Sequence, residues 1–262
     1  MGNLQFGLMS IGICIALFFG MVLFLELGRR IGMDQSKKRG PDARAGVGVV
    51  DSAVYSLLGL LIGFAFSGAA GRFDKRREIM VHEVNAISTA WLRIDLLPPE
   101  AQPPIRSAFR RYFDALLAAH DNAAGSPEER RQRSLIARAE QDIWKHTVSA
   151  SLAPSGEKAR VLIMPTMNEM FDIVDEERLA QRLHPPMIIY LMLAITAFAG
   201  ALLAGYAMSN APTRNWVHII GVAATISLAS FVILELESPR LGLIRVDAMN
   251  SSLTELRHTM DE

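Results

Sequence analysis

The sequence is poor in the groups that most often carry catalysis or bind charged partners. It has one cysteine, Cys14, which excludes a disulfide within these 262 residues. That thiol lies in an apolar run, where cysteine usually acts as a small hydrophobe. The sequence has no phosphate loop, nucleophile elbow or dinucleotide fingerprint. The formal net charge is zero, so bulk charge gives no reason to expect nucleic acid as a partner.

Metal-ligand spacing is also missing. His82-Glu83 is followed by Ala86 where a helical zinc motif needs a second histidine, so we expect both residues on a solvated helix face. The other histidines are scattered without ligand spacing: His120, His146, His184, His218 and His258. We therefore predict no catalytic residue, no metal site and no cofactor.

Apolar residues, in contrast, are abundant and concentrated. They make up 50% of the chain, although 21% of the residues are charged. A helix that rises about 1.5 Å per residue needs about twenty apolar residues to cross a hydrocarbon core of about 30 Å. Four runs approach or exceed this length: Leu4 to Leu27, Val49 to Gly68, Pro186 to Met208 and Trp216 to Leu236. They predict four transmembrane helices. No basic residue precedes the first run and no cleavage site closes it, so we interpret it as a retained helix.

The second run passes into a charged segment without a helix breaker. Apolar residues continue at spacings of four and three after the run, which places them on one stripe of a helix: Met80, Val84, Ile87, Trp91 and Ile94. The next proline is Pro98. We predict one continuous helix that crosses the membrane, enters water and ends near this proline. Asp51 is expected to cap its start.

Small residues recur at every fourth position inside this second run, at Gly59, Gly63, Ser67 and Gly71. Such a strip lets another helix approach closely. The strip predicts tight helix packing, either within the chain or between copies of it, and the sequence leaves both interpretations open.

The residues between the second and third runs predict three further amphipathic helices. The first carries an apolar stripe at Ile105, Phe109, Tyr112 and Leu116. The second begins at Ser126-Pro127, a cap followed by a first-turn proline, and buries Ile136, Ile143 and Thr147. The third starts near Ser155 and runs toward Leu183, with Met167, Met170, Phe171 and Val174 on its buried side; Pro165 is expected to kink or restart it.

The fold class is therefore an all-α membrane protein with a helical domain between spans two and three. We divide it into residues 1–71 with spans one and two, 72–184 as the helical domain, 185–237 with spans three and four, and 238–262 as a tail. The basic residues Arg72, Lys75, Arg76 and Arg77 are expected to contact anionic lipid head groups or to attract anions toward a vestibule. Glu235 and Glu237 are expected at the water interface.

The segment GFAFSGAAGRFDKRREIMVHEVNAI resembles the second transmembrane helix of bestrophins. Gly63-Phe64 and Arg72-Phe73 match a Gly-Phe pair and an Arg-aromatic pair, and charged residues and Asn85 follow. The whole plan is similar to the bestrophin-like domain family of bacterial membrane proteins: two spans, a helical domain that begins RFDKRR, two more spans, and a Pro-Gly motif. The motif residues of this resemblance are Arg72, Phe73, Asp74, Arg76, Arg77, Asn85, Pro239 and Gly242.

Bestrophins are homopentameric ion channels whose termini and helical domain lie in the cytosol, and their second span lines a hydrophobic neck. The resemblance implies that Ser56, Leu60 and Phe64 line such a neck, with Ser56 in place of a bulky apolar residue. The alternative is that Leu60 and Phe64 are ordinary bundle-core or lipid-facing residues. The sequence after Gly242 lacks the acidic run of the calcium clasp in animal bestrophins, which argues against calcium binding.

The function implied by this resemblance is an oligomeric channel, a pentamer by preference, that passes small monovalent ions. Its expected partners are lipid, ions and its own copies, and its expected location is the bacterial inner membrane with cytoplasmic termini and central domain. Basic residues are almost balanced between the two sides, so orientation follows from the resemblance and not from charge. The alternative function is a membrane-anchored helical scaffold or sensor without a pore.

Overall fold

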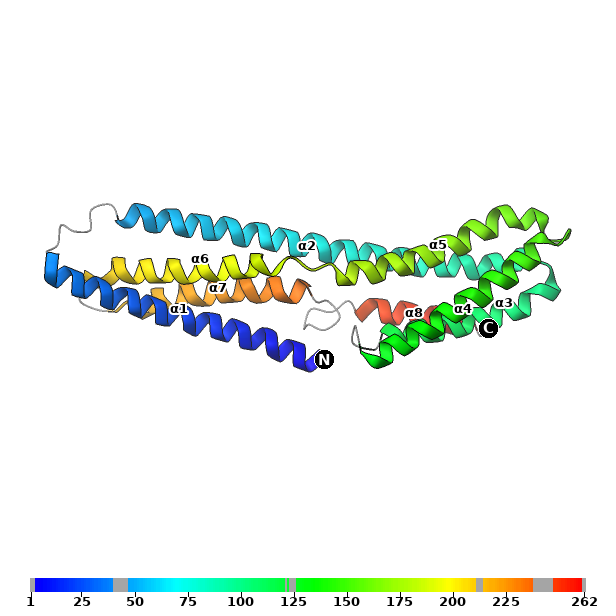
Figure 1. Ribbon diagram of the computed structural model, residues 1–262, viewed down its shortest axis with the longest axis horizontal. Helices are drawn as coiled ribbons and strands as arrows, with labels where there is room; N and C mark the ends of the chain where they lie inside the picture. The colour runs from blue at the N-terminus through cyan, green and yellow to red at the C-terminus, as the bar shows by residue number, and fades with distance from the viewer. Residues whose placement is uncertain are drawn as a thin grey trace. The chain divides into compact units, whose positions relative to one another are not determined.

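The computed structural model describes residues 3–39, 47–120, 122, 126–210, 214–237 and 247–260, and regular structure within these ranges is helical throughout. The α-helices, labelled in Figure 1, are α1 (Asn3–Arg39), α2 (Val47–Arg93), α3 (Gln102–His120), α4 (Pro127–Leu152), α5 (Glu157–Arg182), α6 (Met187–Ala207), α7 (Trp216–Glu237) and α8 (Asp247–Thr259). Short 3₁₀ turns follow α2, precede α3 and follow α6: η2 (Ile94–Leu96), η3 (Pro99–Ala101) and η4 (Met208–Asn210).

The predicted all-α membrane fold is confirmed. Four of the described helices, α1, α2, α6 and α7, are long and apolar enough to cross a membrane. They coincide with the four apolar runs of the sequence. The protein is therefore a multi-span membrane protein.

The continuity of the second span is also confirmed. α2 is a single helix of 47 residues, and η2 follows it before Pro98. The predicted cap at Asp51 is wrong, because α2 begins at Val47 and Asp51 lies within the helix as a buried residue. The start of an apolar helix is poorly marked here because the residues before Asp51 are small and apolar and can extend the helix by a turn.

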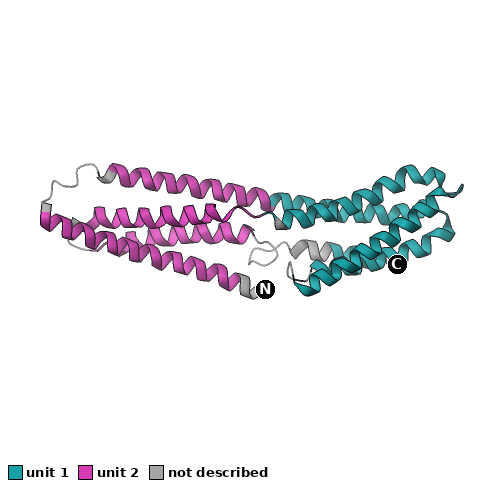
Figure 2. Ribbon diagram, viewed as in Figure 1, with its two compact units in different colours: residues 1, 74–183, 245–262 teal, residues 2–73, 184–244 magenta. Residues whose placement is uncertain are grey.

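The chain forms two compact units, coloured separately in Figure 2. The membrane unit holds residues 2–73 and 184–244, and the helical unit holds residues 74–183 and 245–262. In the membrane unit α1 packs along α6 and α7. A buried apolar cluster joins these helices to α2 through side chains such as Met21 of α1, Leu58 of α2, Ala201 of α6 and Ala223 of α7.

Two glycines allow α1 and α6 to approach at backbone distance. A Cβ added to Gly205 of α6 would lie 1.8 Å from the Leu25 carbonyl oxygen of α1, and one added to Gly28 of α1 would lie 1.9 Å from the Leu202 carbonyl oxygen of α6. Both positions exclude any side chain unless the helices separate. Among the described helices of the membrane unit, α1 and α6 therefore approach each other to within backbone contact.

The helical unit is built from the end of α2 together with α3, α4, α5 and α8, and the predicted apolar stripes form its core. Ile87 of α2, Ile94 of η2, Phe109 of α3, Ile143 of α4 and Met170 of α5 are all fully buried in one cluster. Aromatic rings reinforce it, since Trp91 lies 5.6 Å from Phe109 between ring centroids. The amphipathic pattern of the sequence therefore located this core correctly.

Of two local sequence signals in the helical unit, the cap of α4 is confirmed and the proline of α5 does not interrupt its helix. The predicted cap of α4 is confirmed, because the Ser126 hydroxyl accepts a hydrogen bond of 3.0 Å from the Glu129 backbone nitrogen. Pro165 does not restart a helix, since α5 runs through it. The missing N–H of Pro165 leaves the Val161 carbonyl without its helical donor, and the Arg93 guanidinium donates to the neighbouring Leu162 carbonyl.

The tail contains a helix that the sequence pattern did not predict. α8 belongs to the helical unit, and Leu253 and Met260 are buried in its core. Arg257 of α8 forms an ion pair with Asp114 of α3 at 2.6 Å, and Arg110 of α3 donates to the Met260 carbonyl. A short helix with few apolar residues gives a weak periodic signal, and these contacts with α3 are what hold it in place.

Candidate functional site

The membrane half of α2 has one buried side and one open side. Successive residues of an α-helix turn by about 100°, so Asp51, Leu58 and Ala69 fall on one side, and all three are buried. Leu60 and Phe64 fall on the opposite side, where 53% and 68% of their surfaces are exposed. Ser56 is exposed on that side as well. The three residues predicted to line a neck therefore share the open face of α2.

The predicted packing strip is also open; at about 100° per residue it begins beside the line of Leu60 and Phe64 at Gly59 and reaches that line near Gly71. A Cβ added at Gly59, Gly63 or Gly71 would have no atom of the described residues within 4 Å. Ser67 is exposed too. Among the described residues of the membrane unit, glycines meet the backbone of another helix at the α1–α6 crossing instead. Packing of this strip against a second copy stays a prediction.

The span of α2 is also the least covered of the four. Of its most apolar stretch 11% is buried within the chain, against 22% for α1 and for α6 and 28% for α7. The chain's own helices therefore leave most of this span of α2 uncovered, and its exposed surface carries both large apolar side chains and small residues. Such a surface must be covered by lipid, by other copies or by both.

Arg72, the first residue of the family motif, is held by the end of α7. Its Nε donates to Glu237 Oε1 at 2.9 Å, and one of its terminal nitrogens also contacts this oxygen. Glu237 and its neighbour Glu235 are both buried. Both residues lie at the carboxyl end of α7, where Glu237 pairs with Arg72 of α2. Their expected position at the water interface stays a prediction, since burial within the chain does not fix their depth in a membrane.

Arg76 has a comparable role in the helical unit. It is buried, and its guanidinium donates to the carbonyl oxygens of Ala180 at 3.2 Å and Leu183 at 3.0 Å. These are carbonyls at the carboxyl end of α5, which lack partners within the helix. Lys75 forms surface ion pairs with Glu78 and Glu176. Arg72, Lys75 and Arg76 thus all contact groups of their own chain.

The remaining motif residues lie apart from the open face of the span. Asp74, Arg77 and Asn85 are exposed, and Phe73 is half-buried. Pro239 and Gly242 lie outside the described residues.

The structure also brings together three side chains that the spacing argument passed over. Glu83 of α2, His120 of α3 and Glu177 of α5 offer ligand atoms that all lie within 4.8 Å of one another. The expectation that Glu83 lies on a solvated helix face is wrong, since it is fully buried. Its position between Met80 and Ile87, three and four residues away on the apolar stripe, was the signal that could have placed it inside.

Comparison with known proteins places this arrangement in a family. No curated protein matches the sequence. A crystal structure of a bacterial Bestrophin homolog from Klebsiella pneumoniae, carrying one substitution, matches with a TM-score of 0.70 at 16% identity over 96% of this chain and 97% of that chain. A structure of the homolog from the same organism, solved by Zn-SAD phasing, matches with a TM-score of 0.65 at 17% identity over 94% of this chain and 97% of that chain. These likenesses show the fold.

The family itself is shown by sequence. The model of the Bestrophin-like domain matches residues 14–250, which include part of the first span, the other three spans and the helical domain between them. The chain therefore belongs to the Bestrophin-like domain family.

Proposed function

We propose that this protein is an oligomeric ion channel in which copies of α2 surround a shared axis and their open faces form a hydrophobic neck. The observation that carries the proposal is the difference between the two sides of the α2 span. Leu60 and Phe64 present apolar surface, Gly59 and Gly63 present none, and the opposite side of the helix packs against its own chain. Membership of the Bestrophin-like domain family and the fold of the bacterial Bestrophin homologs support it.

The neck would control permeation by its apolar lining. A narrow ring of leucine and phenylalanine side chains holds water poorly, and an ion that loses its hydration there gains no polar ligand in return. Conduction then depends on the width of the ring. Removing side-chain volume at Leu60 should widen and wet the constriction, whereas Ser56 would contribute a ring of hydroxyls next to it.

The small-residue strip supports assembly of this neck. Helices associate in lipid chiefly by close packing, because lipid tails are as apolar as leucine. Glycine lets neighbouring helices approach, and the strip of α2 is open along its length. Five copies are proposed, since the family resemblance is to pentameric channels, with termini and helical unit in the cytoplasm of a bacterial cell.

A flux assay tests the proposal. The purified full-length protein is reconstituted into liposomes loaded with a monovalent salt, and ion release is followed for the wild type, Leu60→Ala and Leu191→Ala. Leu191 of α6 is a matched control, since 51% of its surface is exposed against 53% for Leu60. We expect Leu60→Ala to raise the flux severalfold above wild type and Leu191→Ala to leave it unchanged.

Two results would count against a pore. One is the absence of flux from both the wild type and Leu60→Ala when light scattering confirms an oligomer in the same preparation. The other is an equal effect of Leu60→Ala and Leu191→Ala, which would place Leu60 at a lipid-facing surface. The first outcome would favour a membrane-anchored scaffold.

A further inference from the structure

The helical unit contains a buried group of metal-ligating side chains that the proposed neck does not use. Glu83 comes from α2, His120 from α3 and Glu177 from α5, so three helices converge on one point. Glu83 is fully buried, Glu177 is 7% exposed, and the His120 side chain is 6% exposed. Buried carboxylates and imidazoles at such short range are costly unless their charges are compensated.

The separation of His120 and Glu83 is close to that of two ligands around one ion. His120 Nε2 and Glu83 Oε1 lie 3.8 Å apart, beyond the usual 2.7–3.2 Å of an N–H···O hydrogen bond. Two ligand atoms that each lie about 2.1 Å from one ion in tetrahedral geometry are separated by roughly 3.4 Å. A shift of a few tenths of an ångström would bring this pair to that separation.

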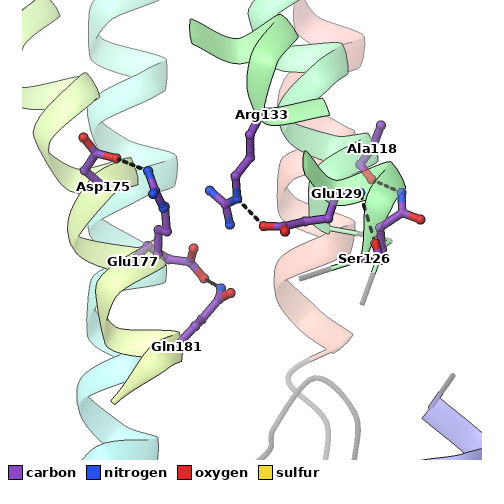
Figure 3. A network of polar contacts seen from close by, with 9 residues as sticks. Ala118, Ser126, Glu129, Arg133, Asp175, Glu177 and Gln181 are labelled. Carbon is purple, nitrogen blue, oxygen red and sulfur yellow. Dashed lines mark hydrogen bonds and ion pairs between the residues drawn. The ribbon is translucent and has the colours of Figure 1, made fainter. Parts of the chain in front are cut away.

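A neighbouring side chain holds one of the carboxylates in position. Gln181 Nε2 donates to Glu177 Oε1 from one turn further along α5, a contact drawn in Figure 3. Hydrogen bonds of this kind fix the orientation of a ligating carboxylate.

The surroundings of the group are acidic. Tyr112 of α3 is fully buried, and its hydroxyl has no hydrogen-bond partner among the described residues. Burial raises the pKa of this hydroxyl well above its usual range, and the charges of Glu140, Glu83 and Asp175 raise it further. Arg133 is paired with Glu129, and Arg178 lies 3.4 Å from Asp175. These two guanidinium groups thus each pair with a carboxylate outside the group.

We propose that Glu83, His120 and Glu177 form a binding site for a divalent transition-metal ion that cross-links α2, α3 and α5. One imidazole and two carboxylates are a donor set that suits Zn²⁺ or a similar ion, because Mg²⁺ and Ca²⁺ prefer oxygen ligands alone. The ligands carry two negative charges when the imidazole is neutral, which a divalent ion balances. The three protein ligands leave a fourth position of a tetrahedral ion for water.

Zinc titration of the full-length protein in detergent tests this site. The protein is treated with a chelator, dialysed and titrated with ZnCl₂ by calorimetry, and the bound metal is counted by elemental mass spectrometry. The wild type should bind one tight ion per chain. His120→Ala, Glu83→Gln and Glu177→Gln should each weaken this binding at least tenfold, whereas His146→Ala, which changes an exposed histidine of α4, should leave it unchanged.

A second readout separates binding from general damage to the fold. Zinc should raise the thermal midpoint of the wild type and of His146→Ala but not that of Glu177→Gln, whose glutamine keeps the shape of the side chain. If a variant loses its helical circular dichroism, the remaining two variants decide the outcome. Retention of one tight ion per chain in folded Glu177→Gln and Glu83→Gln, or the absence of tight zinc in the wild type, would overturn the proposal. Neither result depends on ion flux, so the site can fail while the channel stands.

Discussion

The close approach of α1 and α6 in the membrane unit can be tested by substituting Gly205 of α6. Gly205→Ala places a methyl group 1.8 Å from the Leu25 carbonyl oxygen, and Leu25 backbone carbon atoms lie within 3 Å as well. Ordinary contact of a Cβ begins at 3.4 Å. Because the obstructing atoms belong to the backbone of α1, they cannot rotate aside. The two helices must separate along the crossing or lose their contact there.

We expect Gly205→Ala to destabilise the protein by as much as the most costly overpacking substitutions in protein cores. Extra methylene groups in a packed core usually cost about 1–3 kcal/mol, and here the clash is with backbone. We expect a loss of about 3 kcal/mol in the free energy of unfolding of the membrane unit. For a chain of this size, about 1 kcal/mol lowers the thermal midpoint by roughly 2–4 °C, so the midpoint should fall by roughly 6–12 °C.

The assay compares two identical substitutions in spans of the same unit. Gly221 of α7 is a matched control, because a Cβ added there meets no atom of the described residues within 4 Å. Thermal unfolding of Gly205→Ala and Gly221→Ala is followed in detergent by circular dichroism and by loss of the monodisperse peak. Gly221→Ala should stay within about 0.5 kcal/mol of the wild type. Equal midpoints for the two variants would refute the close approach of α1 and α6.

Three further substitutions test individual contacts. Glu237→Gln removes the charged partner of Arg72, and we expect the free energy of unfolding to fall by about 2 kcal/mol, measured by thermal unfolding. Adding Arg72→Gln should cause little further loss. A double variant whose loss equals the sum of the two single losses would show that the side chains act separately. Ser126→Ala removes the cap of α4 and should lower the free energy of unfolding by about 1 kcal/mol, whereas Ser126→Gly should lower it by only a few tenths. Equal losses of stability in these two variants would exclude capping by Ser126. Burial and then the charge of Asp175 raise the pKa of Glu140, against an opposing effect of Arg178. The folded state therefore keeps this proton to higher pH than the unfolded state does, so stability falls as pH rises between the two pKa values. Glu140→Gln should reduce this fall when midpoints are compared from about pH 4 to about pH 8, and an unchanged pH profile would contradict the argument.

Much of the fold follows from periodicity, because burial in lipid or in a helical core requires long, regular apolar patterns. The four runs became α1, α2, α6 and α7, and the stripe from Met80 to Ile94 became part of the core of the helical unit. The cap at Ser126 was equally readable, since its signal is local. Patterns of this kind depend only on residues that are close together in the sequence, so they can be read from it.

Features that depend on distant residues were harder to predict. The ion pair of Glu237 with Arg72 could not be read from the sequence, because 165 positions separate the two residues. Glu83 reads as part of a charged helix face until His120 and Glu177 arrive from two other helices. The open strip of α2 and the glycine crossing of α1 with α6 share the same residue type, and the contacts of the folded chain distinguish them. The role of Ser56, Leu60 and Phe64 in conduction remains a prediction, since it depends on copies of the chain.

The symmetry of the purified particle tests the central claim of a neck built from α2 most directly. Electron cryomicroscopy of the full-length protein in detergent or nanodiscs should give a ring of five subunits, with the open face of each α2 turned to the axis and Leu60 and Phe64 at its narrowest part. A monomer, a dimer, or a ring in which Leu60 and Phe64 face lipid would contradict the claim.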